Sequence, residues 1–237
     1  MSKKQFFCIV DTETTIKDTV ADFGAVVCDR EGKIFTQCAI LVHEHYDTHE
    51  LFHYTAEDGT IWGKRGLQIR KENYRKMLEA GTRSIASVSA INRWIAKAID
   101  TYNPALTAYN LPFDLSKCAN TGIELTQFRD SFCLWALAVG NLTDSKEYRN
   151  FVLQNHLFNS PTDLRNMTFK TNAEVMASFL AGQVLPDEPH TSLEDILGYE
   201  LPVLKAIVKK RKWREKNVPY NWREMQVKDH FAAKKPT

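Results

Sequence analysis

The chain begins with a short, continuous apolar run that is typical of a strand buried on both faces of a sheet. This run covers residues 5–10, and two further apolar runs follow at 23–28 and 34–42. A turn-rich link of hairpin length, residues 29–33, joins the second run to the third. Three strands with short links between them predict an antiparallel meander.

After this meander, the apolar positions change to a helical period. Ile91, Ile95 and Ile99 repeat at helical spacing and predict a helix over residues 87–102. Pro104 ends that helix, because the residue before a proline is disfavoured in helical backbone.

Strand–helix units follow in the second half of the chain. Residues 105–109 predict a strand with a helix over 113–119 behind it, and the same order recurs over 128–139. Alternation of strands with helices is typical of parallel strand pairs joined by crossover helices.

The remaining pattern completes a single domain. Residues 141–172 are polar and poorly periodic, whereas 173–181 and 192–209 predict helices. Together these elements predict one α/β domain over residues 1–210. It has a mixed sheet, built from an antiparallel three-strand meander plus parallel strands, with flanking helices.

Residues 43–81 interrupt this order and are interpreted as an insertion. The stretch is rich in His, Tyr, Trp and charged residues, and only 73–80 looks helical. Within it, His49-Glu50-x-x-His53 matches the pattern in which two histidines bind zinc and a glutamate acts as the base of a metalloprotease.

The surroundings of this motif argue against a protease. The stretch is too short and too polar for a long core helix, and Gly59 stands where a further histidine would follow. A zinc metalloprotease and a structural zinc site stay open as alternatives, and a solvated, histidine-rich insertion is favoured.

Aromatic and basic side chains are interleaved in two stretches. Proteins that bind single strands stack bases on aromatic faces and hold the backbone with cations, so both stretches are candidates for substrate handling. Ordinary packing of aromatics among solvated charges is the alternative. The residues are Trp62, Lys64, Arg65, Arg70, Lys71, Tyr74, Arg75 and Lys76, and then Trp213, Tyr220 and Trp222 with their basic neighbours.

Composition places the 237-residue chain among ordinary globular proteins, with 43% hydrophobic and 25% charged residues. No segment reaches the roughly 20 apolar residues that span a bilayer, so no membrane association is expected. Residues 1–4 lead directly into the first apolar run, so we expect no secretory signal. The five cysteines include no Cys-x-x-Cys pair, which favours reduced thiols and a cytoplasmic location.

The formal net charge of +2 is unevenly distributed. From Glu200 onward there are eleven Lys and Arg and four acidic residues, a balance of +7, which leaves −5 on residues 1–199. We interpret residues 211–237 as a basic carboxy-terminal extension. A basic surface beside an acidic centre favours polyanion binding, and a simply solvated tail is the alternative.

Acidic residues follow two of the predicted strands. Asp11 and Glu13 come directly after the first apolar run. Alternate residues of a strand project from the same face, so both carboxylates can point to one place. Asp114 follows the strand at 105–109, near the start of the next helix. A solvated strand end and a helix-stabilising acid are the respective alternatives.

A histidine and a further acid lie before the last helix. His190 precedes Asp195 by five residues, and residues five apart do not share an α-helical face. We therefore expect His190 on a loop and Asp195 in the first helical turn. A capping box begun by Ser192 is the structural alternative for Asp195.

Four carboxylates that converge on one place repel each other unless cations lie between them. Magnesium and manganese favour carboxylate oxygens and water. Two such ions can activate a water and stabilise the leaving oxygen in phosphodiester hydrolysis. A histidine, with its ordinary pKa of about 6.5, suits removal of the water proton. These residues predict a metal-dependent phosphodiesterase.

The same residues resemble the three exonuclease motifs of the DEDD superfamily, histidine subclass. This family includes proofreading subunits of DNA polymerases, oligoribonuclease and ribonuclease T. Residues 22–27 also resemble the family's second strand, and the match runs in order from about residue 4 to residue 208. The motif segments are Val10-Asp11-Thr12-Glu13-Thr14, Ala108-Tyr109-Asn110-x-x-Phe113-Asp114 and His190-Thr191-Ser192-Leu193-Glu194-Asp195.

The resemblance implies a ribonuclease H-like fold and 3′–5′ exonuclease activity that releases nucleoside monophosphates with two Mg²⁺ or Mn²⁺ ions. It implies that Asp11, Glu13 and Asp195 hold one ion. Asp11 would also hold the second, with help from Asp114, and His190 would be the general base. The expected substrate-binding residues are Thr12, Thr14, Asn110 and Phe113.

Single-stranded DNA is the favoured substrate, and short RNA is a close alternative, because no residue that reads the 2′-hydroxyl is identified. The resemblance extends to small exonucleases of bacteriophages, for which the location would be the host cytoplasm. A polymerase or replication partner is compatible with it. A binding module without catalysis is the non-enzymatic alternative, against which the presence of all five chemical residues argues.

Overall fold

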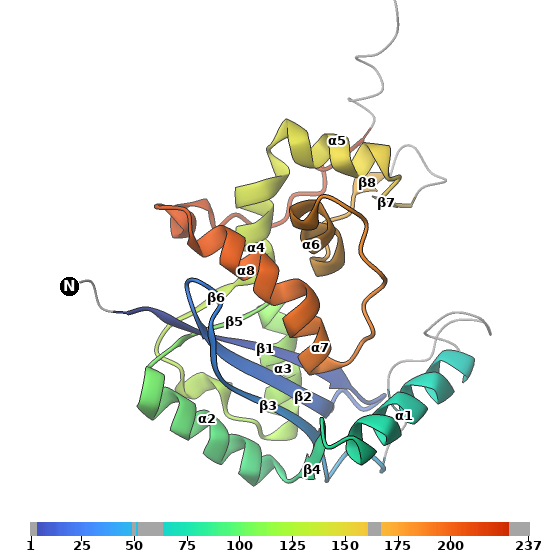
Figure 1. Ribbon diagram of the computed structural model, residues 1–237, viewed down its shortest axis with the longest axis vertical. Helices are drawn as coiled ribbons and strands as arrows, with labels where there is room; N and C mark the ends of the chain where they lie inside the picture. The colour runs from blue at the N-terminus through green and yellow to red at the C-terminus, as the bar shows by residue number, and fades with distance from the viewer. Residues whose placement is uncertain (1–3, 49–50, 52–63, 161–166, 228–237) are drawn as a thin grey trace, which may run out of the picture.

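A six-stranded mixed sheet lies at the centre of the protein and carries helices on both faces (Figure 1). This computed structural model describes residues 4–48, 51, 64–160 and 167–227, with the backbone alone for 64–67. The sheet order is β4-β3-β2-β1-β5-β6. These strands are β1 (Phe6–Thr14), β2 (Val20–Asp29), β3 (Ile34–Val42), β4 (Ser84–Ala86), β5 (Ala105–Ala108) and β6 (Ser131–Cys133).

The first three strands form the antiparallel meander that the sequence predicts. β1 pairs with β2, and β2 with β3, in antiparallel register. β5 runs parallel to β1, β6 to β5, and β4 to β3. A separate short pair consists of β7 (Phe158–Asn159) and β8 (Thr168–Phe169). The predicted α/β class with a mixed sheet is confirmed.

Two groups of helices cover the two faces of the sheet. α2 and α3 lie on one side, and α4, α6, α7 and α8 lie on the other (Figure 1). The α-helices are α1 (Lys64–Glu79), α2 (Val88–Tyr102), α3 (Leu111–Thr121), α4 (Leu134–Ala138), α5 (Lys146–Gln154), α6 (Ala173–Ala181), α7 (Ser192–Asp195) and α8 (Leu201–Val208). The π-helical segment η2 (Val139–Thr143) follows α4, and the π-helical segment η3 (Ile196–Glu200) follows α7. Two short 3₁₀ turns are η1 (Leu125–Gln127) and η4 (Trp213–Lys216).

The alternation of side chains along β1 divides the core into two layers. Phe7 and Ile9 pack with the helices from α4 to α8. Cys8 and Val10 pack with α2 and α3 on the opposite face. All four side chains are fully buried, as expected for a central strand with both faces covered. This alternation decides the direction in which the polar residues at the end of β1 point.

The structure differs from the predicted elements in places where periodicity is weak. β1 continues past the apolar run to Thr14, because its pairing with β2 extends through the acidic residues. β4 and α5 were not predicted, because β4 has only three residues and α5 buries only Tyr148 and Val152. The predicted helix over 192–209 is present as a helical run, but its middle turn is π-helical.

The predicted insertion lies between β3 and β4, which pair directly with each other. Its described part contains turns after Val42, a bridge from Leu51 to Thr15, and α1, which starts earlier than the predicted helix at 73–80. The zinc-motif residues His49, Glu50 and His53 lie outside the described residues, as do Trp62 and the side chains of Lys64 and Arg65.

The described part of α1 does not form the predicted nucleic-acid surface as a whole. Tyr74 is fully buried against Tyr46, and Arg70 is only 4% exposed. Arg75 is exposed, but it forms ion pairs with two glutamates of its own helix. The prediction of an exposed substrate-handling role is therefore wrong for Tyr74 and Arg70, which pack inside the fold.

The carboxy-terminal extension packs on the domain near its start and near the end of its described part. The Trp213 ring is buried, with centroids 5.9 Å from Phe7 and 4.9 Å from Phe132. Further along, the Val227 N–H donates to the Met167 carbonyl at 3.1 Å. The boundary predicted at residue 210 therefore does not mark the end of the packed core, and Trp213 is a core side chain rather than a stacking surface.

The five cysteines are all free thiols, as the sequence predicts. Among the helices of the described residues, none is both long enough and apolar enough to cross a membrane.

Candidate metal centre

The carboxyl-terminal end of β1 brings acids from both faces of the sheet to one place. Asp11 and Glu13 continue the alternation of Phe7 and Ile9, so they project towards α7. Thr12 projects to the opposite face, where its hydroxyl donates to Asp114 Oδ1 of α3 at 2.8 Å. That hydrogen bond fixes the α3 carboxylate beside the strand end.

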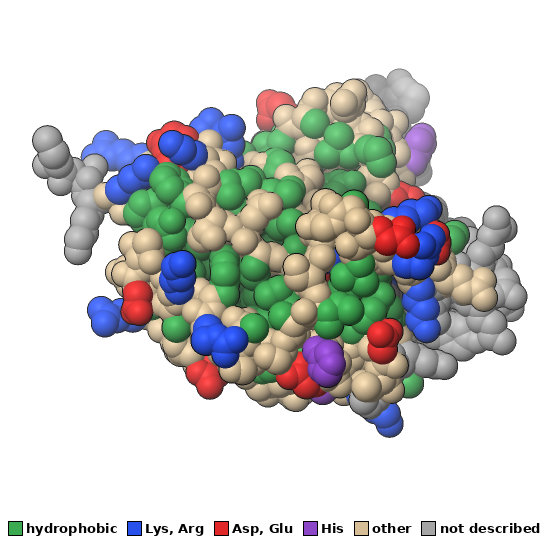
Figure 2. All heavy atoms as spheres, turned by 60° about the horizontal axis from the view of Figure 1, so that its bottom comes forward, with side chains coloured by type: hydrophobic (Ala, Val, Ile, Leu, Met, Phe, Trp, Pro, Cys, Tyr) green, Lys and Arg blue, Asp and Glu red, His purple; other side chains and the backbone are tan. Residues whose placement is uncertain are grey.

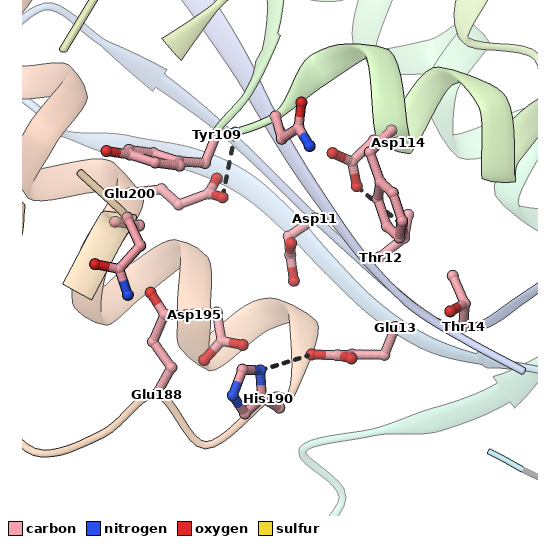
Figure 3. A pocket seen from close by; sticks show the side chains of 14 residues that line it. Asp11, Thr12, Glu13, Thr14, Tyr109, Asp114, Glu188, His190, Asp195 and Glu200 are labelled. Carbon is pink, nitrogen blue, oxygen red and sulfur yellow. Dashed lines mark hydrogen bonds and ion pairs between the residues drawn. The ribbon is translucent and has the colours of Figure 1, made fainter. Parts of the chain in front are cut away.

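A pocket of about 350 Å³ opens at this strand end, and every site residue predicted from the sequence lines it (Figure 3). The side chains come from β1, from the start of α3, and from α7 with the loop before it. The predicted residues are Asp11, Thr12, Glu13, Thr14, Asn110, Phe113, Asp114, His190 and Asp195, and the others that line the pocket are Tyr109, Asn172, Ala173, Glu188 and Glu200.

Two acids of the pocket, Glu188 and Glu200, were not predicted. Glu188 lies between two prolines in a loop, where an acid is ordinarily solvated. Glu200 lies five residues after Asp195. In an α-helix, residues five apart point in directions about 140° apart, so the two acids are not expected on the same face. The sequence held one signal for Glu200, which is its position between Tyr199 and Leu201 in an apolar helix. An acid in such a helix is rarely buried without a partner, so a buried Glu200 indicates a binding partner.

One compact set of possible metal ligands is present among the described residues. Ligand atoms of Glu13, His190 and Asp195 all lie within 4.8 Å of one another. His190 Nδ1 is 3.9 Å from Glu13 Oε1. Asp11 and Asp114 line the same pocket but lie outside this set. The structure thus groups the predicted base with two of the predicted ligands.

The polar atoms of the pocket suit a cation. Asp195 is 6% exposed and Glu200 is 3% exposed. Asp195 Oδ1 and Glu200 Oε2 are buried and have no hydrogen-bond partner among the described residues. A buried acceptor without a donor is costly, and a bound cation removes that cost. The donor set is rich in carboxylate oxygen, the ligand type that Mg²⁺ and Mn²⁺ favour.

The carboxylates of the pocket repel one another when they are ionised. Burial raises the pKa of Asp114 to about 7. Burial, and then the charge of Glu188, raise the pKa of Asp195 to about 8. Burial first, and then neighbouring carboxylates, raise the pKa values of Asp11 and Glu200 well above the ordinary range. These shifts are the effect expected of buried acids that share one site, because each negative charge opposes the ionisation of its neighbours.

His190 is neutral in this environment. Burial, and then the nearby guanidinium of Arg70, lower its pKa to about 4. A neutral imidazole can accept a proton or bind a metal. The backbone of His190 is left-handed, with φ of 53°, and such conformations occur often at functional sites.

α7, which carries Asp195, is held against β2 by a buried polar network. The Asp22 carboxylate accepts the Ser192 N–H at 3.0 Å. The Arg83 guanidinium donates to both oxygens of Asp22, at 3.1 and 3.2 Å. Gly24 permits the close approach, because a Cβ atom at this residue would lie 2.7 Å from the Ser192 carbonyl carbon.

Gly24→Ala is expected to lower the stability of the protein. The added methyl group must push the start of α7 away from the sheet, and overpacking of this kind costs about 1–3 kcal/mol. Gly198→Ala is the matched control, since its Cβ meets no atom within 4 Å. Thermal unfolding of both variants measures the difference. Equal melting temperatures would show that the contact does not fix α7.

The metal-free protein is expected to lose stability as the pH rises from about 6.5 to 8.5. Asp114 and Glu188 have a pKa of about 7, and Asp195 of about 8, all above the value of roughly 4 for unfolded acids. Over this window the folded state binds more protons than the unfolded chain, so its stability falls as they leave.

Because ligands must lose their protons to bind metal, added Mg²⁺ should raise the melting temperature more at the higher pH. Thermal unfolding in EDTA and in Mg²⁺, at both pH values, provides the test. A melting temperature in EDTA that rises with pH would contradict the carboxyl pKa values.

In comparisons with known proteins, no protein-family model matches the chain, and no curated protein matches it either. Function is therefore inferred from the residues of the pocket and from their geometry.

Proposed function

We propose that this protein is a divalent-metal-dependent 3′–5′ exonuclease that acts on single-stranded DNA and releases nucleoside monophosphates. The observation that supports this proposal is the convergence of Asp11, Glu13, Asp114, His190 and Asp195 in one pocket from three distant segments. The mixed sheet is compatible with the ribonuclease H-like fold of the DEDD superfamily, histidine subclass, which we include in the proposal.

Each acid has a role in this proposal. Asp11, Glu13 and Asp195 would hold one Mg²⁺ or Mn²⁺ ion, and Asp11 and Asp114 would hold the second. When bound, such ions make water more acidic and neutralise charge on the phosphate. Thr12 orients Asp114 through its 2.8 Å hydrogen bond, so the second set does not depend on a freely rotating side chain.

His190 would act as the general base. Its neutral imidazole takes a proton from the attacking water, whose oxygen forms a new bond to phosphorus. The bond between phosphorus and the 3′-oxygen of the preceding nucleotide breaks, and that oxygen leaves as a hydroxyl after protonation. The products are a 5′-monophosphate and a strand that is one nucleotide shorter.

A second hollow supports a single-stranded substrate. It has a volume of about 430 Å³ and shares Tyr109, Asn110 and Asn172 with the metal pocket. Trp135 and Tyr220 also line it, and their rings stack with centroids 5.1 Å apart. Aromatic faces beside a metal pocket suit an unpaired base, because every base has a face that can stack.

Tyr220→Ala is expected to weaken binding of single-stranded oligonucleotides about 5- to 150-fold, the equivalent of about 1–3 kcal/mol for one stacked base. Trp222→Ala is the control, because Trp222 is 49% exposed and does not line the hollow. Fluorescence anisotropy in EDTA measures affinity without turnover. Equal affinities for the two variants would place the strand elsewhere.

The face of the protein shown in Figure 2 carries charges of both signs. On the face shown in Figure 2, the described Lys and Arg side chains are scattered among acidic and hydrophobic ones rather than gathered in one patch. A mixed surface of this kind attracts a polyanion less than a continuous basic one does.

The test of the proposed function is a degradation assay with 5′-labelled strands. In Mg²⁺ or Mn²⁺, a DNA oligonucleotide should shorten one nucleotide at a time from its 3′ end, and EDTA should stop the reaction. Matched DNA and RNA strands, single and double, determine the substrate class. Intact strands under every one of these conditions would overturn the proposal.

A further inference from the structure

Glu200 carries a buried carboxylate that the proposed mechanism has not used. Its Oε1 accepts the Tyr109 N–H at 3.3 Å, whereas its Oε2 is buried and has no hydrogen-bond partner among the described residues. The side chain lines the metal pocket and points towards the same space as Asp11 and Asp195 (Figure 3).

The π-helical turn explains how Glu200 reaches the pocket. The Leu201 N–H donates to the Ile196 carbonyl, which is the i to i+5 hydrogen bond of a π-helix. Such a turn brings residues five apart close to the same side of the helix, whereas an α-helix separates them by about 140°. Asp195 and Glu200 therefore line the same pocket.

We propose that Glu200 is an additional ligand of a divalent cation, bound in the part of the pocket next to Asp11 and Asp114. The assignment of Mg²⁺ or Mn²⁺ rests on the proposed function, but the cation-binding role of Glu200 can be tested without nucleic acid. Three observations support the proposal. Glu200 Oε2 has no hydrogen-bond partner among the described residues, the side chain is buried, and it lines a pocket rich in carboxylates.

The charge balance indicates what Glu200 adds. Two divalent cations are neutralised by the four carboxylates of Asp11, Glu13, Asp114 and Asp195. A fifth carboxylate, which loses its proton when the cation binds, adds negative charge beside the ion and supplies another oxygen to an ion otherwise held in part by water. The second ion should then bind this protein tightly even before substrate supplies its phosphate oxygens.

Glu200→Gln separates this role from a purely structural one. Glutamine keeps a side-chain oxygen for the Tyr109 N–H but loses the negative charge. If Glu200 served only to hold Tyr109, cation affinity would not change. If Glu200 is a ligand, the affinity for one of the two ions should fall at least about 10-fold, the lower end for changes around a metal.

The experiment is a calorimetric titration of the full-length protein with Mn²⁺ alone. Wild type should bind two ions. Glu200→Gln should bind one with unchanged affinity and the other weakly, and Glu31→Gln, a change at an exposed hairpin residue, should match wild type. Equal affinities for both ions in wild type and Glu200→Gln would overturn the inference, as would a wild type that binds no Mn²⁺.

A second measurement covers the case in which Glu200→Gln fails to fold. Anomalous scattering from Mn²⁺ in wild-type crystals should place an ion against the Glu200 carboxylate, and ions placed only against other residues would overturn the inference. The two proposals fail separately. Mn²⁺ binding that depends on Glu200 without strand shortening refutes the exonuclease alone, whereas strand shortening with Glu200 away from any ion refutes this inference alone.

Discussion

Asp11→Asn is expected to reduce strand degradation by at least about 10²–10³-fold, the usual loss when one preorganised electrostatic group is removed from a reacting centre. The reason is its position. Asp11 is central among the pocket acids, and the neighbouring charges of Glu200 and Asp114 act on it most strongly. Asparagine has nearly the same shape but no charge, so cations should be lost while the fold remains.

The stability of the same variant makes this prediction sharper. Burial raises the pKa of Asp11 well above its ordinary range, so its charge is a cost in the metal-free protein. Asp11→Asn should therefore melt at or above the wild-type temperature in EDTA and gain less from Mg²⁺. Asp100→Asn, on the exposed face of α2, is the control. Degradation by Asp11→Asn at the wild-type rate would refute the metal assignment.

His190→Ala is expected to lower the single-turnover rate about 10²–10⁴-fold, the usual contribution of a general base. The pKa of about 4 keeps the imidazole neutral near pH 7. Its 3.9 Å separation from Glu13 places it beside the ligand set. Pre-steady-state measurement with excess enzyme isolates the chemical step.

His156→Ala is a closely matched control for this variant. His156 has φ of 55° and His190 has φ of 53°, so both substitutions place alanine in the same left-handed backbone. Only the His190 change removes a group from the pocket. Added imidazole should restore part of the lost rate if proton transfer is the role of His190. An unchanged rate in His190→Ala would show that another group takes the proton.

The sequence was sufficient to predict the antiparallel meander, because a strand has a strict two-residue repeat. The nine candidate site residues line one pocket, and their roles stay predictions. Asp11 and Glu13 had to share a face once the apolar run was read as a buried strand. Their convergence with Asp114 and Asp195 followed from motif order rather than from periodicity, since contacts between distant segments depend on topology.

The sequence was insufficient where the local geometry is unusual. Glu200 was missed because a π-helical turn departs from the 3.6-residue period on which helix predictions rest. Arg70 was taken for a surface cation, but it is buried near Glu13. Burial and the charge of Asp195 raise the pKa of Glu13 well above its ordinary range, and Arg70 opposes that rise. A charged side chain of this kind cannot be told from a solvated one until its acidic neighbours are known.

The carboxy-terminal segment packs against the core, and this packing limits how far the chain can be shortened without exposing the core. Trp213 fills a space between aromatic rings of β1 and β6, and the strand-like contact of Val227 with Met167 comes later still. A truncation at residue 210 would remove an indole from the interior and leave Phe7 facing water. Fragments meant to keep the packed core intact should therefore extend at least to Val227.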